Sequence, residues 1–276
     1  MNKRLTALRK LAAAPHIVWA VLFIIAPLLF VAYYAFTDEN GAFSLESFAQ
    51  MADPNYIQVF VRSVSFAIIA TFICFLIAYP LAYFISQMKI NTQGMLIMLA
   101  MLPMWMNLLI RTYSWMTILE DTGVINTILG YIGIDPIKMI NTPGAVILGM
   151  VYNYLPYMIM PIYSAMTKID RSHIEAARDL GCNSMNVITR VVFPLSVSGI
   201  ISGITMVFVP SISTFYISQK LGGGNFDLVG DTIERQFQLV NNKNLGASMS
   251  LVLMVLILIC MAVMNKFGND DDEVII

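Results

Sequence analysis

EAARDLGCNSMNVITRVVFP, the stretch from Glu175 to Pro194, is a charged, helix-forming segment that lies between two long apolar runs. The tetrapeptide SHIE, residues 172–175, leads into this stretch and has the pattern of a capping box. In that pattern the Ser172 hydroxyl and the Glu175 carboxylate satisfy the first free backbone N–H groups of a helix. Gly181 stands where a C-terminal glycine would end that helix. The stretch therefore predicts a short capped helix on which a partner can dock.

The composition of the 276 residues places the chain in a membrane. It is 58% hydrophobic and only 12% charged, whereas soluble domains are about 25% charged. Six apolar stretches reach the length of about 20 residues that crosses a bilayer, near residues 17–36, 63–86, 95–119, 142–167, 195–217 and 245–267. Because lipid cannot satisfy open backbone groups, each span must be helical. The sequence thus predicts an all-α integral membrane protein with six transmembrane helices.

The first apolar stretch follows basic residues, as a signal peptide does. Its apolar run is longer than the apolar core of a signal peptide, and it ends at YYAF, Tyr33 to Phe36, without the small residues of a cleavage site. We therefore expect a retained span. The expected divisions are an N-terminal segment at 1–16, the six-span domain at 17–267 and a solvated acidic tail at 268–276.

The distribution of lysine and arginine predicts the orientation of the spans. Most of the sixteen basic residues fall in one set of loops, namely Lys3, Arg4, Arg9, Lys10, Lys89, Lys168, Arg171, Arg178, Arg190 and Lys266. The positive-inside rule therefore makes both termini and the segment 168–194 cytoplasmic. The opposite loops are rich in acids, which attract cations, although such an excess also accompanies the positive-inside bias on its own.

Polar residues within the spans indicate either a transport path or polar contacts between helices. They recur at helical spacing in the third, fourth and fifth stretches, as Asn107, Arg111, Ser114 and Trp115, then Asn153, Tyr157 and Ser164, then Ser198, Ser202 and Thr205. Prolines interrupt the same stretches, at Pro103, Pro156, Pro161 and Pro210. Broken helices with hydroxyl and aromatic groups at depth favour a transport path.

The role expected for Arg111 depends on the charge of the substrate. A buried guanidinium repels a cation, so for a cationic substrate we expect Arg111 to have a structural partner such as Glu120 or a main-chain carbonyl. For an anionic substrate, Arg111 becomes the leading candidate ligand.

The segment that begins at Glu175 resembles the EAA loop of ABC-importer permeases, where EAA is followed by three residues, Gly, nine residues and I-x-L-P. Glu175, Ala176, Ala177 and Gly181 match, and the tail VVFP alters the two apolar positions. The resemblance implies a type I ABC importer permease fold with a coupling helix within 168–194 that binds a groove of the cytoplasmic ATPase. The implied coupling residues are Glu175, Ala176, Ala177, Asp179 and Gly181, with the two alanines allowing close approach.

Three longer segments resemble the permease subunits of spermidine/putrescine importers. They are LPMWMNLLIRTYSW (102–115), NTPGAVILGMVYNYLPYMIMPIYSAM (141–166) and FYISQKLGGG (215–224), and the likeness covers most of the chain. It implies a polyamine path along Trp105, Asn107, Tyr113, Tyr154, Phe215 and Tyr216, because aromatic faces attract ammonium groups. Gln219 departs from the pattern, since relatives carry an acid there. Strong selectivity is therefore expected in a separate binding protein or in the second permease.

The sequence contains no P-loop, H-E-x-x-H or G-x-S-x-G motif. We therefore expect no catalytic residue, metal site or bound cofactor in this chain, and ATP with Mg to be used by a partner. The implied partners are a second permease subunit, a homodimeric cytoplasmic ATPase, an extracytoplasmic polyamine-binding protein and the lipid of a bacterial inner membrane, but no nucleic acid. The outer segment 218–244 either meets the binding protein or is a plain connector helix.

Two alternatives remain open at this point. A permease of the same fold could carry another small solute, such as ferric iron, sulfate or thiamine. A membrane scaffold or receptor without transport activity is the other.

Overall fold

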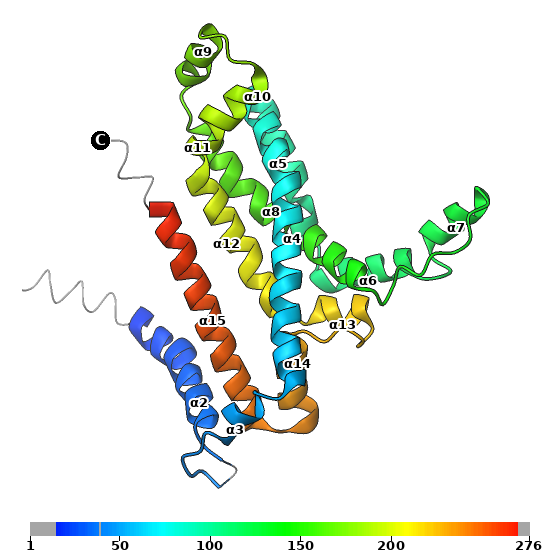
Figure 1. Ribbon diagram of the computed structural model, residues 1–276, viewed down its shortest axis with the longest axis vertical. Helices are drawn as coiled ribbons and strands as arrows, with labels where there is room; N and C mark the ends of the chain where they lie inside the picture. Colours follow the sequence, from blue (N-terminus) through cyan, green and yellow to red (C-terminus); the bar gives the residue numbers. More distant parts are fainter. Residues whose placement is uncertain (1–14, 39, 270–276) are drawn as a thin grey trace, which may run out of the picture. The chain divides into compact units, whose positions relative to one another are not determined.

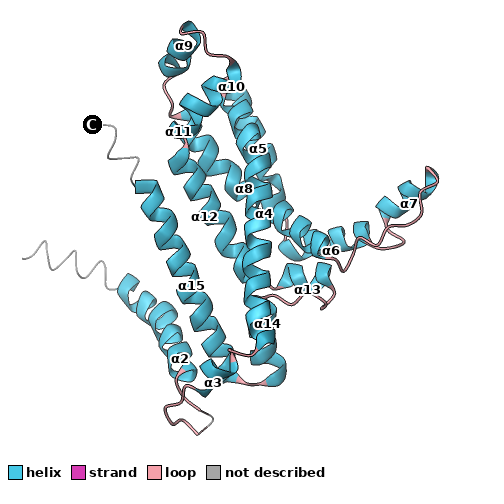
Figure 2. Ribbon diagram, viewed as in Figure 1, coloured by secondary structure: helices cyan, strands magenta, loops and turns pink. Residues whose placement is uncertain are grey.

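The computed structural model describes residues 15–38 and 40–269, which are mostly helical and contain no named β-strand (Figure 2). The segments 1–14 and 270–276, which hold most of the predicted N-terminal segment and acidic tail, lie outside the described residues. The elements in chain order are η1 (Val21–Ile25), α2 (Ala26–Ala35), α3 (Glu46–Gln50), α4 (Pro54–Ser86), α5 (Ile90–Trp105), α6 (Leu108–Leu119), α7 (Val124–Tyr131), α8 (Pro143–Thr167), α9 (Arg171–Asp179), α10 (Ser184–Val187), η2 (Ile188–Val192), α11 (Phe193–Leu195), α12 (Val197–Ser213), α13 (Tyr216–Gly222), α14 (Val229–Arg235), η3 (Gln236–Val240) and α15 (Lys243–Asn269), where η marks a π-helical turn.

Two compact units divide the chain. The first contains residues 1–57 and 232–255, and the second contains residues 58–231 and 256–276. In the first unit, the Ser248 hydroxyl donates to the Ala35 carbonyl at 3.1 Å, which ties the end of α2 to α15. All the predicted site residues belong to the second unit.

The described residues hold four helices that are each long and apolar enough to cross a membrane, Pro15–Ala35, Pro54–Ser86, Pro143–Thr167 and Lys243–Lys266. Two further spans are bent pairs of helices, so the described part has six spans if each pair counts as one. The prediction of an all-α membrane protein is therefore confirmed, and its span count agrees on this basis.

The third span is not the continuous helix predicted at 95–119. The helices flanking Met106 and Asn107 meet at 87°. Pro103 lies in the last turn of α5, where its ring and missing N–H weaken the helix. Asn107 then caps the next helix, because its side-chain oxygen accepts from the Leu109 N–H at 2.8 Å. The expectation that Asn107 lies on one helical face with Arg111 is therefore wrong.

The fifth predicted span, 195–217, is also broken. A bend of 71° separates Ser184–Leu195 from Val197–Ser213. At the bend, the Ser196 hydroxyl donates to the Phe193 carbonyl at 3.1 Å, which satisfies that group locally. The helix ends at Ser213, and extended Thr214 leads into α13. Consequently the last residues of the predicted span belong to a separate short helix.

Segment 218–244 is largely helical and contains both buried and exposed residues, which does not distinguish a binding surface from a connector. Leu221, Leu228 and Val229 are fully buried. The segment is fastened to the start of α4, because the Ser63 hydroxyl accepts from the Val229 N–H at 2.8 Å and the Arg62 guanidinium donates to the Asp227 carbonyl at 3.4 Å.

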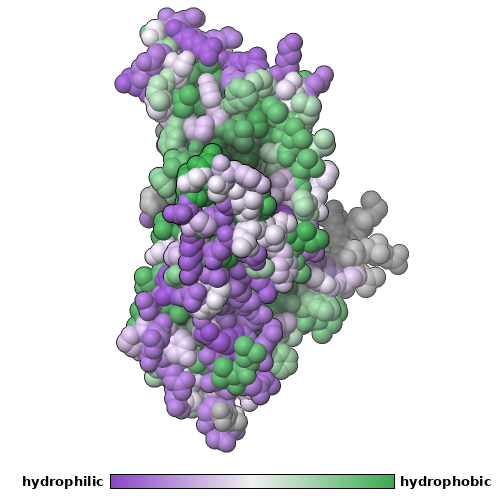
Figure 3. Space-filling model, turned by 90° about the vertical axis from the view of Figure 1, so that its right-hand side faces the viewer, coloured by the Kyte–Doolittle hydropathy of each residue, from purple (hydrophilic) through white to green (hydrophobic). Residues whose placement is uncertain are grey.

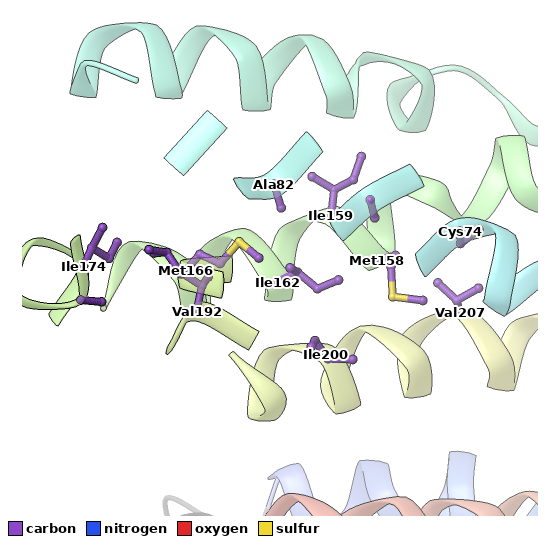
Figure 4. Close-up of a cluster of buried hydrophobic side chains, with 13 residues drawn as sticks. Cys74, Ala82, Met158, Ile159, Ile162, Met166, Ile174, Val192, Ile200 and Val207 are labelled. Atoms are coloured by element: carbon purple, nitrogen blue, oxygen red, sulfur yellow. The ribbon is translucent and has the colours of Figure 1, made fainter. Parts of the chain in front are cut away.

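The main core of the second unit lies between α4, α8 and α12, and α9 reaches into it (Figure 4). Two glycines of α12, Gly199 and Gly203, let that helix lie directly on α8. A Cβ at Gly199 would come within 2.5 Å of the Ala165 Cβ, and one at Gly203 within 2.7 Å of the Met158 sulfur. This G-x-x-x-G contact is typical of close packing between membrane helices.

Candidate functional site

The helix α9 carries the predicted coupling residues and begins with a different cap from the one predicted. Asp170 is the N-cap, and its side chain accepts from the Ser172 N–H at 2.9 Å. The predicted capping box of Ser172 and Glu175 is therefore wrong. Aspartate caps a helix as well as serine does, and here the acid two residues earlier takes the position.

Hydrogen bonds from Ser172, first from its backbone N–H and then from its side chain, hold the pKa of Asp170 below its usual value of 3.8. The carboxylate is thus favoured in the folded state. Its contribution to α9 is present above the pH at which the unfolded carboxyl ionises, and it is lost as the pH falls through the lowered pKa.

The other end of α9 is closed by a glycine, as predicted. Gly181 has a φ of +83°, in the left-handed region that favours glycine. Its N–H donates to the Arg178 carbonyl at 2.9 Å, and the Cys182 N–H donates to the Ala177 carbonyl at 3.1 Å. These two bonds form a Schellman motif, which satisfies carbonyls at the end of the helix.

The two faces of α9 have different surroundings. Ile174 and Ala177 are buried in the main core together with Met166 and Val187, so α9 is packed onto its own chain. Figure 4 shows Ile174 of α9 and Met166 of α8 in this core. The exposed face carries Glu175, Ala176, Asp179 and Leu180. The expectation that both alanines serve close approach by a partner is therefore wrong for Ala177, whose small side chain lets α9 lie on the core.

Leu180 was missed by the sequence reasoning. Its side chain is 86% exposed at the end of α9, next to the glycine turn. It lies at the end of the second unit that carries α9 (Figure 1), where Figure 3 shows many hydrophilic residues. A single exposed apolar side chain is ordinary on a protein surface, so Leu180 is a candidate contact only because it adjoins the exposed residues of α9. Its position directly before Gly181 is the signal that could have found it.

Two cavities border α9. One of about 490 Å³ is lined by the C-terminal end of α8, the start of α9 and the start of α12, including Lys168, Asp170 and His173. The other, of about 300 Å³, lies at the turn between α4 and α5 and includes Lys89, Arg171 and Ile174. The helix therefore has open space beside it on two sides.

Gln93 connects the turn before α5 to α8 and was not predicted. Its side-chain N–H groups donate to the Ser86 carbonyl at 3.1 Å and the Met88 carbonyl at 2.8 Å, while its oxygen accepts from the Tyr163 hydroxyl at 2.9 Å. A buried amide with this many partners fixes the elements that it joins. The hydrogen bonds of Gln93 therefore connect the end of α4 to α8, and these elements lie next to α9. We call this connection the frame around α9.

The predicted substrate-path residues come together only in part. The rings of Tyr113, from α6, and Tyr216, from α13, meet edge to face with centroids 6.4 Å apart. The Lys220 ammonium lies 5.5 Å from the Tyr113 centroid and 5.8 Å from the Tyr216 centroid. These three side chains form what we call the tyrosine–lysine cluster.

The remaining path residues lie in separate places. The Tyr154 hydroxyl donates to the Pro210 carbonyl at 3.4 Å, within the packing of α8 on α12. Phe215 is the N-cap of α13 and is exposed, and Trp105 is 73% exposed at the end of α5. Asn107 is exposed and caps α6. Only Tyr113 and Tyr216 thus share a recorded contact.

Arg111 is buried, yet two of its guanidinium nitrogens, Nε and Nη1, have no hydrogen-bond partner. Among the described residues, the structure records no ion pair between Arg111 and Glu120, the partner suggested by the sequence. Nine residues of helix separate the two by about 13 Å along the axis, which is too far for contact. Arg111 also does not share a surface with Ser114, which is exposed.

No group of three or more histidine, cysteine, aspartate or glutamate residues that could hold a metal ion occurs in the described part of the chain.

Comparison with known proteins places these features in one family. Residues 11–268 match the family described as "Binding-protein-dependent transport system inner membrane component". Similar proteins include the spermidine/putrescine transport system permease protein PotB of Haemophilus influenzae, 38% identical over 272 residues and covering 95% of both chains. PotB of Escherichia coli K12 is 36% identical over 245 residues, which are 86% of this chain and 89% of that protein.

Solved structures share the fold at low sequence identity. A bacterial ABC transporter involved in the import of the acidic polysaccharide alginate contains a chain with a TM-score of 0.83 and 16% identity, covering 97% of this chain and 96% of that one. The methionine ABC transporter MetNI gives a TM-score of 0.52 at 15% identity, covering 80% of this chain and 97% of that one. The chain has the fold of an ABC-importer permease and belongs to the family of binding-protein-dependent transport system inner membrane components.

Proposed function

We propose that this chain is a transmembrane permease subunit of an ATP-driven importer of polyamines such as spermidine and putrescine. The observation that carries the proposal is the identity of 36% to 38% with permeases named for spermidine and putrescine, over most of both chains. The aromatic and hydroxyl groups of Tyr113 and Tyr216 support it, because they suit the ammonium groups and methylenes of a polyamine.

The partners proposed for this chain are a second permease subunit, a homodimeric ATPase and an extracytoplasmic polyamine-binding protein. One alginate importer structure includes a periplasmic protein bound to an alginate pentasaccharide. We assign ATP and Mg to the ATPase and no cofactor to this chain. Both termini and α9 lie on the cytoplasmic side in this proposal, and the helical segment 218–244 meets the binding protein outside.

Coupling to ATP hydrolysis is assigned to the exposed face of α9. Glu175, Ala176, Asp179 and Leu180 contact the ATPase, and Gly181 allows the turn that holds this face outward. When the ATPase closes, it displaces α9. Because Ile174 and Ala177 are packed against the ends of α8 and α10, the displacement reaches the spans that line the path. Binding in the path is weak, since tight binding would prevent release.

The proposal is tested by the ATPase activity of the reconstituted complex with its binding protein, titrated in parallel with spermidine, putrescine, ferric iron and sulfate. Stimulation by the polyamines alone is expected, and it leaves Arg111 a structural residue. Stimulation by sulfate would overturn the choice of substrate. The buried Arg111, with two unpaired nitrogens, would then be the first ligand to test.

A further inference from the structure

A lysine of the chain itself occupies the aromatic pair on the proposed path. The Lys220 ammonium lies within 5.8 Å of both tyrosine ring centroids, inside the range of about 6 Å at which a cation is attracted to an aromatic ring. Lys220 is in the last turn of α13, one helical turn after Tyr216, so the two side chains project from the same face. Tyr113 completes the cluster from α6, because its ring meets the Tyr216 ring edge to face.

The cluster is open to a ligand. Tyr113 is 45% exposed, and Tyr216 and Lys220 are both partly exposed. Among the described residues, the structure records no ion pair between Lys220 and a carboxylate. Its recorded partners are the two tyrosines. The short α13 is itself held firmly, since Ile217 and Leu221 are fully buried against α8. The lysine is therefore a flexible side chain on a fixed base.

We propose that the Lys220 ammonium is a tethered stand-in for the ammonium group of a substrate, and that a polyamine displaces it from the Tyr113–Tyr216 pair during transport. This inference rests on the proposed function for the identity of the substrate, although the displacement itself concerns any alkylammonium ion. A lysine side chain ends in the same primary ammonium, on a chain of methylenes, that a polyamine carries. The rings therefore attract both by the same interaction.

Self-occupation lowers the apparent affinity of the pair. A site filled by its own lysine for nine-tenths of the time binds a competing cation about tenfold more weakly than the empty site. Once the substrate has left, the Lys220 ammonium again contacts the rings of Tyr113 and Tyr216. The cluster thus promotes release of the cation and provides a partner for the rings when no substrate is present.

The first experiment measures the reactivity of Lys220 toward an amine-reactive acetylating reagent, in the assembled complex, by mass spectrometry. The competing probe is hexamethonium, which carries two quaternary ammonium groups and does not consume the reagent. Acetylation of Lys220 is expected to rise about threefold or more as hexamethonium saturates the rings. Exposed Lys138 is the internal reference and should not change. Unchanged or reduced labelling of Lys220 would overturn the proposal.

A variant distinguishes displacement of Lys220 from the rings from simple repulsion between Lys220 and a cationic substrate. Tyr216→Leu removes one ring, so Lys220 should be acetylated faster even without hexamethonium, and the probe should add little. If the lysine only repels cations and does not rest on the rings, this variant leaves its reactivity unchanged, which would contradict the proposal.

The second experiment compares Lys220→Met and Lys220→Arg with the wild type, by titrating spermidine onto the permease–ATPase complex without the binding protein. Met keeps the length but removes the charge, so the dissociation constant is expected to fall about fivefold or more. Arg keeps a positive charge that can contact the rings, so the dissociation constant for spermidine in Lys220→Arg should stay near the wild-type value. If the dissociation constant for spermidine is unchanged in Lys220→Met, the proposal that Lys220 occupies the site in place of the substrate is wrong.

The two proposals fail in different ways. If the wild-type complex does not respond to polyamines while hexamethonium still exposes Lys220, the polyamine assignment is wrong and the tethered lysine stands. If polyamines are imported but neither the reactivity of Lys220 nor the affinity of Lys220→Met changes, the importer stands and the tethered lysine is wrong.

Discussion

Gly181 is the residue at which the backbone of α9 requires a left-handed conformation. No atom lies within 4 Å of an added Cβ, so a substitution there acts through backbone strain and charge instead of through collision. We predict that Gly181→Asp leaves the protein in the membrane but separates ATP hydrolysis from uptake. Uptake should fall about tenfold or more, which corresponds to about 1.4 kcal/mol in the barrier to transport.

The control is Gly181→Asn, because asparagine has the same size and tolerates the left-handed region. It lacks the negative charge that is unfavourable at the C-terminal end of a helix. The measurement is uptake into proteoliposomes alongside ATPase activity. Wild-type uptake by Gly181→Asp would contradict the coupling role of this turn.

Asp170 is the second residue on which α9 depends. We predict that Asp170→Ala weakens coupling, because the Ser172 N–H loses its acceptor and the first turn of α9 frays. Asp170→Asn keeps a capping oxygen and should retain most of the uptake. The comparison is the ratio of uptake to ATP hydrolysis in the two variants, and equal ratios would show that the cap does not matter.

At the scale of residues, the sequence predicted the end of α9 but not its beginning. A glycine at the end of a short helix is a local pattern with one physical meaning, and Gly181 fits it. Two acceptable caps, Asp170 and Ser172, stand two residues apart, and local chemistry does not distinguish them. The burial of Ala177 depends on contacts with residues such as Met166 and Val187, which sequence spacing does not display.

The contact between α8 and α12 depends on the glycine pair of α12. We predict that Gly199→Ala lowers the stability of the complex by about 1 to 3 kcal/mol, because the added methyl group collides with Ala165 and with the Pro161 carbonyl. The matched control is Gly94→Ala in α5, where no atom lies within 4 Å. There alanine should be neutral or stabilising by about 0.5 to 1 kcal/mol.

Thermal inactivation of the purified complex measures both glycine variants. If Gly199→Ala inactivates at the same temperature as Gly94→Ala, the two helices have room to separate and the close contact is not needed for stability.

The frame around α9 depends on Gln93. Gln93→Leu leaves the Tyr163 hydroxyl and two backbone carbonyls without their partner, and we predict a loss of about 1 to 3 kcal/mol. Tyr163→Phe removes only one of these bonds and should cost less. Exposed Asn91→Leu is the control for adding an apolar side chain nearby. The order of the three thermal transitions tests the prediction, and an unshifted Gln93→Leu contradicts it.

At the scale of elements, the apolar stretches could be found from hydropathy, but the breaks in two of them could not. The run from 95 to 119 stays apolar through Met106 and Asn107, so neither length nor composition marks the bend of 87° there. Pro103 indicated a disturbance, yet proline also occurs inside continuous helices, as Pro80 does in α4. Whether a helix bends or breaks depends on the packing around it.

The orientation of the whole molecule is predicted from its basic residues and can be measured directly. We expect Leu180→Cys to face the cytoplasm and Tyr131→Cys to face outward, in a background where Cys74, Cys182 and Cys260 are replaced. Both side chains are more than 80% exposed, at 86% and 87% respectively. When the permease is produced without the ATPase, which would cover Leu180, a membrane-impermeant maleimide should label only Tyr131→Cys in intact spheroplasts. It should label both variants after permeabilisation. The reverse pattern would invert the topology.

The two-faced helix α9 also bears on how importers of this fold can diversify. Its outward face is a few side chains on α9 and on Leu180, which follows it, whereas the tyrosine–lysine cluster belongs to other elements of the second unit, α6 and α13. If the cluster binds the solute as proposed, changes to it alter the solute without changing the ATPase that α9 binds. A cell could in this way drive several permeases of different cargo from one shared motor, provided that each keeps the outward face of α9.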